Sequence, residues 1–241
     1  MNWYTDWFNS PYYHILYKNR DDKEAQFFID NLIKHLKIKK NSKILDVACG
    51  KGRHAYYFHK KNMIVNGIDI SLNSINDAKK NKKIGLNFFV HDMRIPFKLK
   101  EFDVITNLFT SFGYFDCEKD ELIAIKSITS SLKKNGILII DFLNIIKVKN
   151  HLIYKEEKKI DGIDFKIERS FDSSKIYKKI SFTDNKKTYN YIEKVRALGL
   201  SNFEHYLSAA NMKVVNIFGN YNLEKFDEKK SDRLILICKC V

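Results

Sequence analysis

The chain has 241 residues, of which 44% are hydrophobic and 14% aromatic, so it can form a sizeable core and is not a disordered polypeptide. Lysines and arginines number 43 against 29 aspartates and glutamates, which gives a formal net charge of +14. No apolar run approaches the ~20 residues of a membrane span, so we expect no membrane partner. The first residues show neither the basic nor the apolar region of a signal peptide.

The cysteines and the basic charge restrict the location and the partners. Cys49, Cys117, Cys238 and Cys240 show no CxxC spacing. They predict neither a zinc site nor a disulfide framework, so we expect no metal and a reducing, cytoplasmic location. The charge has two interpretations, a compositional drift toward lysine or a basic surface for nucleic acid. Because the lysines are dispersed along the chain, drift is the favoured interpretation.

Aromatic residues crowd the first 20 positions, where Pro11 also lies. They are Trp3, Tyr4, Trp7, Phe8, Tyr12, Tyr13 and Tyr17. This density predicts one or two short helices that pack over another part of the protein. The segment is either a lid over a ligand or a hydrophobic cap on a sheet edge, and the lid is favoured because lids commonly exclude water from a site.

Short apolar runs alternate with amphipathic stretches from residue 21 to residue 141. The expected helices cover 21–38, 53–61, 72–80 and 118–132. The expected strands cover 43–48, 64–69, 86–91, 102–107 and 137–141, with a turn over 134–136. Strands that alternate with helices predict an α/β fold with a doubly wound parallel sheet.

The pattern changes after residue 150. Segments with alternating apolar and polar residues lie at 151–169, 175–184 and 187–198, and turn signals such as Asp161-Gly162 separate them. They predict an antiparallel β subdomain. A helix at 202–211 and strands at 212–218 and 233–240 then complete the main sheet. We therefore expect one domain composed of a lid (1–20), a core (21–145), an inserted β subdomain (146–200) and a last helix with a β-hairpin (201–241).

A glycine turn and three acidic residues suggest a ligand site. Asp46-Val-Ala-Cys-Gly-Lys-Gly52 follows the first strand and opens a helix, and its glycines allow a ligand to approach the backbone closely. Asp69 and Asp92 end the next two strands. An acid about twenty residues past such a turn suits the two hydroxyls of a ribose. Ligands of such sheets bind beyond the carboxyl ends of the strands.

These motifs resemble those of class I S-adenosylmethionine-dependent methyltransferases. The similar stretches are Asp46 to Gly52, Gly67-Ile-Asp69-Ile-Ser71, His91-Asp92-Met93-Arg94 and Leu132-Lys-x-x-Gly136. The resemblance implies a Rossmann-like seven-stranded sheet with helices on both faces, the last hairpin reversed, and S-adenosylmethionine as the cofactor. We expect a monomer or a homodimer.

The resemblance also implies roles for the cofactor site. Ala48 and Gly50 would line the methionine end, and Asp46 would orient the turn and approach the amino group of the cofactor. Asp69, followed by Ile70, would hold the ribose hydroxyls.

Further roles fall on the next strand ends and on the lid. Asp92 would accept from the adenine amino group, with Met93 beside the ring, and Asn107 would border the sulfonium. Tyr17 and Arg20 occupy positions at which sugar N-methyltransferases place lid residues on the cofactor carboxylate.

The stretch after the fourth strand favours a small-molecule acceptor. Asn107-Leu-Phe-Thr-Ser-Phe-Gly-Tyr114 lacks the Pro-Pro signature of enzymes that methylate the amino groups of nucleic acids. The chain is therefore most similar to small-molecule N-methyltransferases that act on amino sugars or glycine. No catalytic base is assigned. Candidates on the acceptor side are Tyr114 and Arg169 first, and then Tyr13, His14, Tyr191 and Arg196.

Three alternatives stay open. The first is an RNA or protein methyltransferase that uses the basic surface. The second is a non-catalytic cofactor-binding subunit. The third is a nicotinamide-dependent dehydrogenase, which shares the glycine turn but lacks support from a second catalytic pattern.

Overall fold

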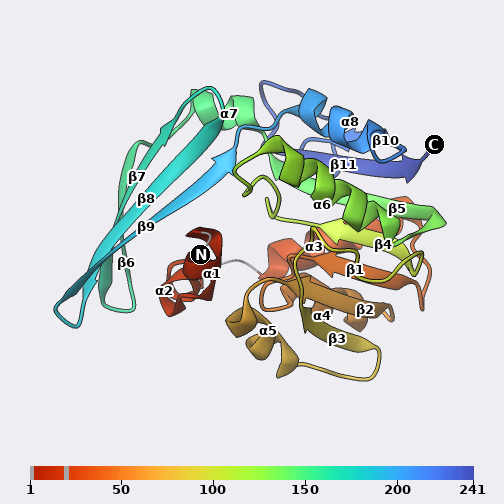
Figure 1. Ribbon diagram of the computed structural model, residues 1–241, viewed down its shortest axis with the longest axis horizontal. Coiled ribbons are helices and arrows are strands. Elements are labelled where there is room, and N and C mark those ends of the chain that lie inside the picture. Colours follow the sequence, from red (N-terminus) through yellow and green to blue (C-terminus); the bar gives the residue numbers. More distant parts are fainter. Residues whose placement is uncertain (1–2, 19–21) are drawn as a thin grey trace.

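A seven-stranded sheet forms the centre of the protein (Figure 1). The computed structural model describes residues 3–18 and 22–241. The sheet has the order β10-β11-β5-β4-β1-β2-β3. Its strands are β1 (Lys43–Val47), β2 (Ile64–Asp69), β3 (Leu86–Val90), β4 (Phe102–Asn107), β5 (Leu132–Leu143), β10 (Met212–Phe218) and β11 (Arg233–Cys240).

The order of the strands reverses between β1 and β4, which are neighbours in the sheet. Strands β1 to β5 are parallel to one another, whereas β11 pairs antiparallel with both β5 and β10. The chain fills one half of the sheet from β1 to β3 and then returns to start the other half with β4. A crevice forms at such a reversal because the connections leave the carboxyl ends of the two strands in opposite directions. The expected class I methyltransferase sheet is confirmed.

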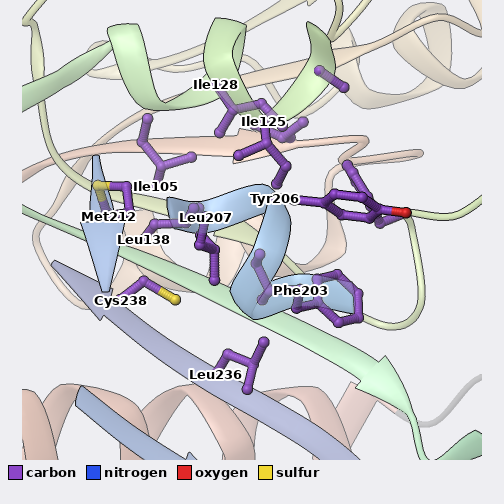
Figure 2. Packing of buried hydrophobic residues seen from close by; sticks show 14 of the residues in the cluster. Ile105, Ile125, Ile128, Leu138, Phe203, Tyr206, Leu207, Met212, Leu236 and Cys238 are labelled. Atoms are coloured by element: carbon purple, nitrogen blue, oxygen red, sulfur yellow. The ribbon is translucent and has the colours of Figure 1, made fainter. Parts of the chain in front are cut away.

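Helices cover both faces of the sheet, and each face has its own core. One face carries α3 (Asp22–Leu36), α4 (Arg53–Lys60) and α5 (Leu72–Lys79). The other carries α6 (Glu118–Ser130) and α8 (Leu200–Ser208). Residues of β5 alternate between the two cores, as a strand buried on both sides requires. Figure 2 shows the second core, in which Phe203 and Leu207 of α8 pack with Ile125 of α6.

A second sheet and two short helices lie beside this core. The second sheet is an antiparallel ribbon in chain order, composed of β6 (Lys155–Ile160), β7 (Ile163–Phe171), β8 (Lys175–Asp184) and β9 (Lys187–Arg196). The helices α1 (Trp3–Asn9) and α2 (Pro11–Leu16) lie between the ribbon and the main sheet (Figure 1). The inner face of the ribbon packs Phe165, Ile167 and Ile180 around Trp7.

Three local predictions differ from the structure. Residues 134–136 are not a turn, because β5 runs through them as a bulge at which its pairing with β4 jumps from Leu132 to Ile137. The last helix begins at Leu200 rather than at residue 202, and Asn202 lies within it and accepts a hydrogen bond from the Gly199 N–H at 2.9 Å. The helix α7 (Ile145–Asn150) was not predicted.

Among the described residues, no helix is both long enough and apolar enough to cross a membrane.

Candidate functional site

The turn after β1 has a backbone that opens onto empty space. Ala48, Gly50 and Gly52 adopt positive φ angles of 57°, 56° and 80°. A methyl group added at Gly50 would meet no atom within 4 Å, whereas one at Gly52 would collide with the Phe88 ring at 2.6 Å. The glycine at 52 is therefore required for packing, and the glycine at 50 leaves room for a ligand.

Asp69, at the end of β2, holds this turn in place. One carboxylate oxygen accepts from the Gly50 N–H and the other accepts from the Ser71 N–H, each at 2.8 Å. Burial raises the pKa of Asp69, and the two N–H groups act in the opposite direction. Each oxygen keeps a lone pair beyond these bonds, so the carboxylate can still accept from ligand hydroxyls.

Asp46 lies inside β1, beneath the turn. Its side chain is 1% exposed and accepts a hydrogen bond from the Thr106 hydroxyl at 2.9 Å. Burial raises the pKa of Asp46 to about 7, although the Thr106 hydrogen bond lowers it. This residue therefore ties β1 to β4 below the site and does not itself belong to the wall of the cavity.

Asp92 follows β3 and is engaged by Arg94. The Arg94 guanidinium donates to both carboxylate oxygens at 2.6–3.1 Å and also pairs with Asp120 at 3.1 Å. Burial alone would raise the pKa of Asp92, but the hydrogen bonds from Arg94 outweigh it and hold the pKa below its usual value. Asp92 is therefore a fixed carboxylate, and Arg94 belongs to an ion-pair network at the rim.

These elements surround a cavity of about 450 Å³ at the carboxyl ends of the parallel strands, a volume typical of small-molecule sites. One wall consists of the glycine turn and the strand ends, with Ala48, Gly50, Asp69, Ile70, Asp92 and Met93. The opposite wall consists of the N-terminal helices and the loop after β4, with Tyr4, Phe8, Tyr13, His14, Tyr17 and Tyr114. The cavity thus has one polar and one aromatic wall.

The N-terminal segment is attached to the ribbon through Glu193 of β9. The Glu193 carboxylate accepts from the Trp7 indole N–H at 2.7 Å and from the Tyr17 hydroxyl at 2.7 and 2.9 Å. Lys178 of β8 donates to the Tyr17 hydroxyl, and burial lowers the pKa of Lys178. Tyr17 lines the cavity, and its hydroxyl is hydrogen-bonded to Glu193 and Lys178 of the ribbon.

Several predicted site residues lie elsewhere. Arg20 lies outside the described residues. Asn107, 1% exposed, donates to the Val47 carbonyl at 3.2 Å and lies behind the cavity wall. Arg169 does not line the cavity, because its guanidinium pairs with Glu156 at 2.5 Å and donates to the Ile153 carbonyl at 3.1 Å. Tyr191 and Arg196 also lie outside the wall.

The structure also adds residues that the sequence did not single out. Arg53, the first residue of α4, lines the cavity, and its guanidinium lies 5.2 Å from the centre of the Phe109 ring. Phe109 and Thr110 both line the cavity with positive φ angles of 60° and 57°. A signal for Arg53 was present, because it directly follows the glycine turn. The conformation of Phe109 and Thr110 has no local sequence signal.

Solved structures with this architecture include S-adenosylmethionine-dependent methyltransferases. One from Clostridium acetobutylicum ATCC 824 superimposes with a TM-score of 0.79 at 21% identity, over 95% of this chain and 96% of that one. The sugar N-methyltransferase KedS8 from Streptoalloteichus sp ATCC 53650 gives a TM-score of 0.75 at 14% identity, over 95% and 93% of the two chains. The chain therefore has the class I methyltransferase fold.

Residues 38–198 match the model of a protein family described as a methyltransferase domain. The chain belongs to that family. The ubiquinone biosynthesis O-methyltransferase of Pelagibacter ubique (strain HTCC1062) is 33% identical over an alignment of 128 residues, which covers 49% of this chain and 52% of that protein. The dTDP-3-amino-3,4,6-trideoxy-alpha-D-glucopyranose N,N-dimethyltransferase of Streptomyces venezuelae is 29% identical over 101 residues, 42% of each. The chain spans about half the length of these relatives.

Proposed function

We propose that this protein is an S-adenosylmethionine-dependent methyltransferase that transfers a methyl group to a small-molecule amine. The observation that carries the proposal is the two-walled cavity. Its polar wall has the groups that an adenosyl cofactor requires, and its aromatic wall encloses the space beside them.

The residues of the polar wall fit this cofactor. The open space over Gly50 accommodates a ligand against the turn, where any side chain would protrude. Asp69 would accept from both ribose hydroxyls, and Asp92 and Met93 would contact the adenine. Ala48 and Gly50 would line the methionine end, with Asp46 and Asn107 supporting the turn and the sulfonium side from behind. Ile70 would pack against the adenosyl group.

The methionine carboxylate requires a cation at the other end of the cavity. Arg53 lines the cavity and supplies positive charge there, whereas Lys51, which also lines it, pairs with Asp77 at 3.0 Å. Tyr17 and Arg20 remain the residues predicted for this role from the resemblance. A guanidinium suits a carboxylate because it can donate two parallel hydrogen bonds.

The chain contributes orientation and exclusion of water to the reaction. When bound, the cofactor supplies an electrophilic methyl group on its sulfonium. A neutral amine brings its own lone pair, so the protein must hold it in line with that methyl group and needs no strong base. The helices α1 and α2 act as the lid over the site. Tyr114 and His14 face the acceptor from the aromatic wall, and the Tyr114 hydroxyl is fixed because it donates to the Thr110 carbonyl at 2.8 Å.

Two observations favour an amine of the amino-sugar class. The N,N-dimethyltransferase relative acts, by its name, on an amino sugar, and sugar N-methyltransferases share the fold over nearly the whole chain, including the ribbon. A cavity with one aromatic wall suits the apolar face of a sugar ring.

The four cysteines are free thiols, which supports a reducing compartment.

Ligand-induced stabilisation and methyl transfer test this proposal. S-adenosylhomocysteine should raise the melting temperature and NAD should not, because only a ligand of the folded state stabilises it. Labelled S-adenosylmethionine should then transfer its methyl group to amines in a panel of amino sugars and amino acids. Stabilisation by NAD alone would contradict the proposal. Binding of S-adenosylhomocysteine without transfer to any acceptor would favour a non-catalytic subunit.

A hydroxyl acceptor is the second candidate, because one relative is named as an O-methyltransferase. The same panel with sugar and phenol hydroxyls separates the two. Transfer to hydroxyls with no transfer to amines would replace the amine proposal.

A further inference from the structure

The loop after β4 contains two consecutive residues in a conformation that they avoid. Phe109 and Thr110 have φ angles of 60° and 57°, in the left-handed region that bulky and β-branched residues seldom occupy. Both residues line the cavity. Such strain persists only where surrounding contacts enforce it, and it concentrates at functional sites. The contacts that enforce it here come from β5 and β11, which lie in the same half of the sheet as β4.

Asp141 of β5 binds the backbone of both strained residues. Its carboxylate accepts from the Phe109 N–H at 2.7 Å, and its backbone carbonyl accepts from the Thr110 N–H at 2.9 Å. The side chain is 1% exposed. A carboxylate at this depth must be paired, and it accepts from the Arg233 Nε at 2.7 Å and from the Tyr221 hydroxyl at 3.1 Å.

Arg233 of β11 completes the clamp. A second nitrogen of its guanidinium donates to the Thr110 hydroxyl at 3.0 Å. The Phe109 ring lies near two guanidiniums, with its centre 5.8 Å from that of Arg233 and 5.2 Å from that of Arg53. The Thr110 carbonyl in turn accepts from the Tyr114 hydroxyl at 2.8 Å. The geometry of the cavity wall from Phe109 to Tyr114 thus depends on one buried ion pair.

This ion pair is not required to join β5 and β11. These strands are already paired antiparallel, with Ile235 opposite Asp141 and Arg233 opposite Leu143. A buried ion pair contributes little net stability, since the desolvation of both charges offsets their attraction. The polar atoms of the pair are directed at the loop instead.

We propose that Asp141 and Arg233 are positioning residues that hold Phe109 and Thr110 in the left-handed conformation and thereby orient the acceptor wall of the cavity. Neither residue lines the cavity. The proposal rests on the methyltransferase function proposed above, because its catalytic readout is methyl transfer. Its structural readout, the protection of the loop, does not depend on that function.

Two variants test the clamp without removing the loop. Arg233→Lys keeps the charge beside Asp141 but loses the planar fork that reaches Thr110. Thr110→Val removes only the hydroxyl that accepts from Arg233, leaves the buried ion pair intact, and covers the case in which Arg233→Lys fails to fold. Lys133→Met is the matched control, since Lys133 pairs with Asp103 at 2.6 Å at the opposite end of β4 and β5.

Amide hydrogen exchange measures the positioning directly. In both variants the amides of residues 108–114 should exchange about tenfold faster than in the wild-type protein, while the amides of β1 should exchange at the wild-type rate. In the control variant the amides of residues 108–114 should also exchange at the wild-type rate. Unchanged exchange in the loop of both variants would overturn the proposal whether or not the protein transfers methyl groups. If the wild-type protein transfers no methyl group at all, the proposed function fails, and the exchange result still decides whether the clamp holds the loop.

Kinetics then test whether the clamp serves catalysis. Arg233→Lys and Thr110→Val should lower kcat by about 10- to 100-fold, because small misplacements of a reacting group are costly. The KM for S-adenosylmethionine should change by less than about threefold, because the polar wall is untouched. The double variant should be no slower than Arg233→Lys alone, since both changes break the same contact. Independent, additive losses, or a faster-exchanging loop with unchanged kcat, would overturn the positioning role.

Discussion

Gly50 and Gly67 are glycines for different physical reasons, and only Gly50 lines the cavity. At Gly50 the φ angle is positive and the side-chain direction is open, so a side chain would be strained and would occupy the ligand space. At Gly67 the backbone is unremarkable, but an added Cβ would lie 2.7 Å from the Phe88 ring and 2.8 Å from the Cys49 sulfur. One glycine therefore serves binding and the other serves packing.

Alanine substitutions should separate these two roles. Gly67→Ala should lower the free energy of unfolding by about 1–3 kcal/mol, because a well-packed core must shift to admit the methyl group. Gly50→Ala should cost about 1–2 kcal/mol from the left-handed backbone and should in addition weaken S-adenosylhomocysteine about tenfold or more. Urea unfolding and calorimetric titration measure the two quantities. Equal loss of affinity in both variants would contradict this assignment.

Glu121 is a buried acid that the proposed chemistry does not use. It lies in α6 and is fully buried. Burial raises its pKa to about 8, while the charge of Arg196 and the neighbouring N–H groups of Gly113 and Phe115 act in the opposite direction. A raised folded-state pKa means that the protonated acid is favoured by folding. The stability that it contributes is complete below the unfolded pKa of about 4.3 and is lost as the pH rises through about 8.

Removing this titration should flatten the pH dependence of stability. Between pH 6 and pH 9, wild-type protein should lose on the order of 2–4 kcal/mol more than Glu121→Gln. Urea unfolding of both proteins at the two pH values gives this difference, in which the titration of Asp46 and of all other groups cancels. Parallel losses in the two proteins would show that Glu121 does not titrate in this range.

At the scale of elements, one carboxylate of the ribbon binds two residues of the N-terminal segment, beside the packing of Trp7 and the hydrogen bond from Tyr12 to Asp184 at 2.8 Å. Glu193 accepts from Trp7 and Tyr17, and both of these residues come from the segment that lies over the cavity. Its side chain is 14% exposed, and Lys178 lies 3.7 Å away at 16% exposed. Loss of this carboxylate would leave the Trp7 indole N–H without its acceptor, while Tyr17 and Lys178 would keep the hydrogen bond between them.

Glu193→Ala should therefore loosen the lid. We expect a loss of about 2 kcal/mol in unfolding free energy, together with faster hydrogen exchange in α1 and α2 and a higher KM for the cofactor. Asp164→Ala is the control, because Asp164 and its partner Lys159 are each 71% exposed and such pairs contribute less than about 1 kcal/mol. Unaltered exchange in α1 and α2 would show that the aromatic packing and the hydrogen bond from Tyr12 to Asp184 hold the lid without Glu193.

Sequence patterns located elements wherever short apolar runs were bounded by polar residues. The strands expected at 102–107, 212–218 and 233–240 match β4, β10 and β11. The helix α7 was missed because its six residues are too few to show a period. The bulge in β5 was taken for a turn because Asn135 and Gly136 are turn formers. The strand resumes its pairing with β4 and begins its pairing with β11 at Ile137, directly after these residues.

The sequence predicted residues of both cavity walls, including Tyr13, Tyr17 and Tyr114 of the aromatic wall, but not the conformation of the loop after β4. Asp69 and Asp92 could be placed together because the ends of parallel strands meet at one edge of the sheet. The loop after β4 could not be predicted, because its conformation depends on Asp141, 32 residues beyond Phe109, and on Arg233, 123 residues beyond Thr110. Arg169 was considered because it lies in the inserted ribbon, and a strand pattern does not reveal which face of the ribbon a side chain occupies.

For the whole molecule, the net charge of +14 is distributed over many elements. Lysines pair with acids across separate parts of the surface, including Lys61 with Asp30, Lys43 with Glu101 and Lys147 with Asp232. Charge that is dispersed in this way attracts polyanions only weakly at physiological salt, because affinity for phosphates requires several simultaneous contacts.

Binding of tRNA should therefore be weak and should vanish at salt concentrations of about 150 mM. Filter binding over a salt series measures both the affinity and its slope. A steep slope combined with methyl transfer to RNA would contradict a small-molecule acceptor and would favour the basic surface as a functional site.

The contact between Trp7 and Glu193 has a consequence for the order in which the chain folds. The two residues are 186 positions apart. At synthesis rates of about 5–20 residues per second, residue 193 leaves the ribosome roughly 10–40 s after residue 7. During that time the aromatic side chains of the N-terminal helices have no ribbon to pack against. The N-terminal helices are therefore among the last segments to reach their native contacts, and chaperones can bind their aromatic side chains until the ribbon emerges.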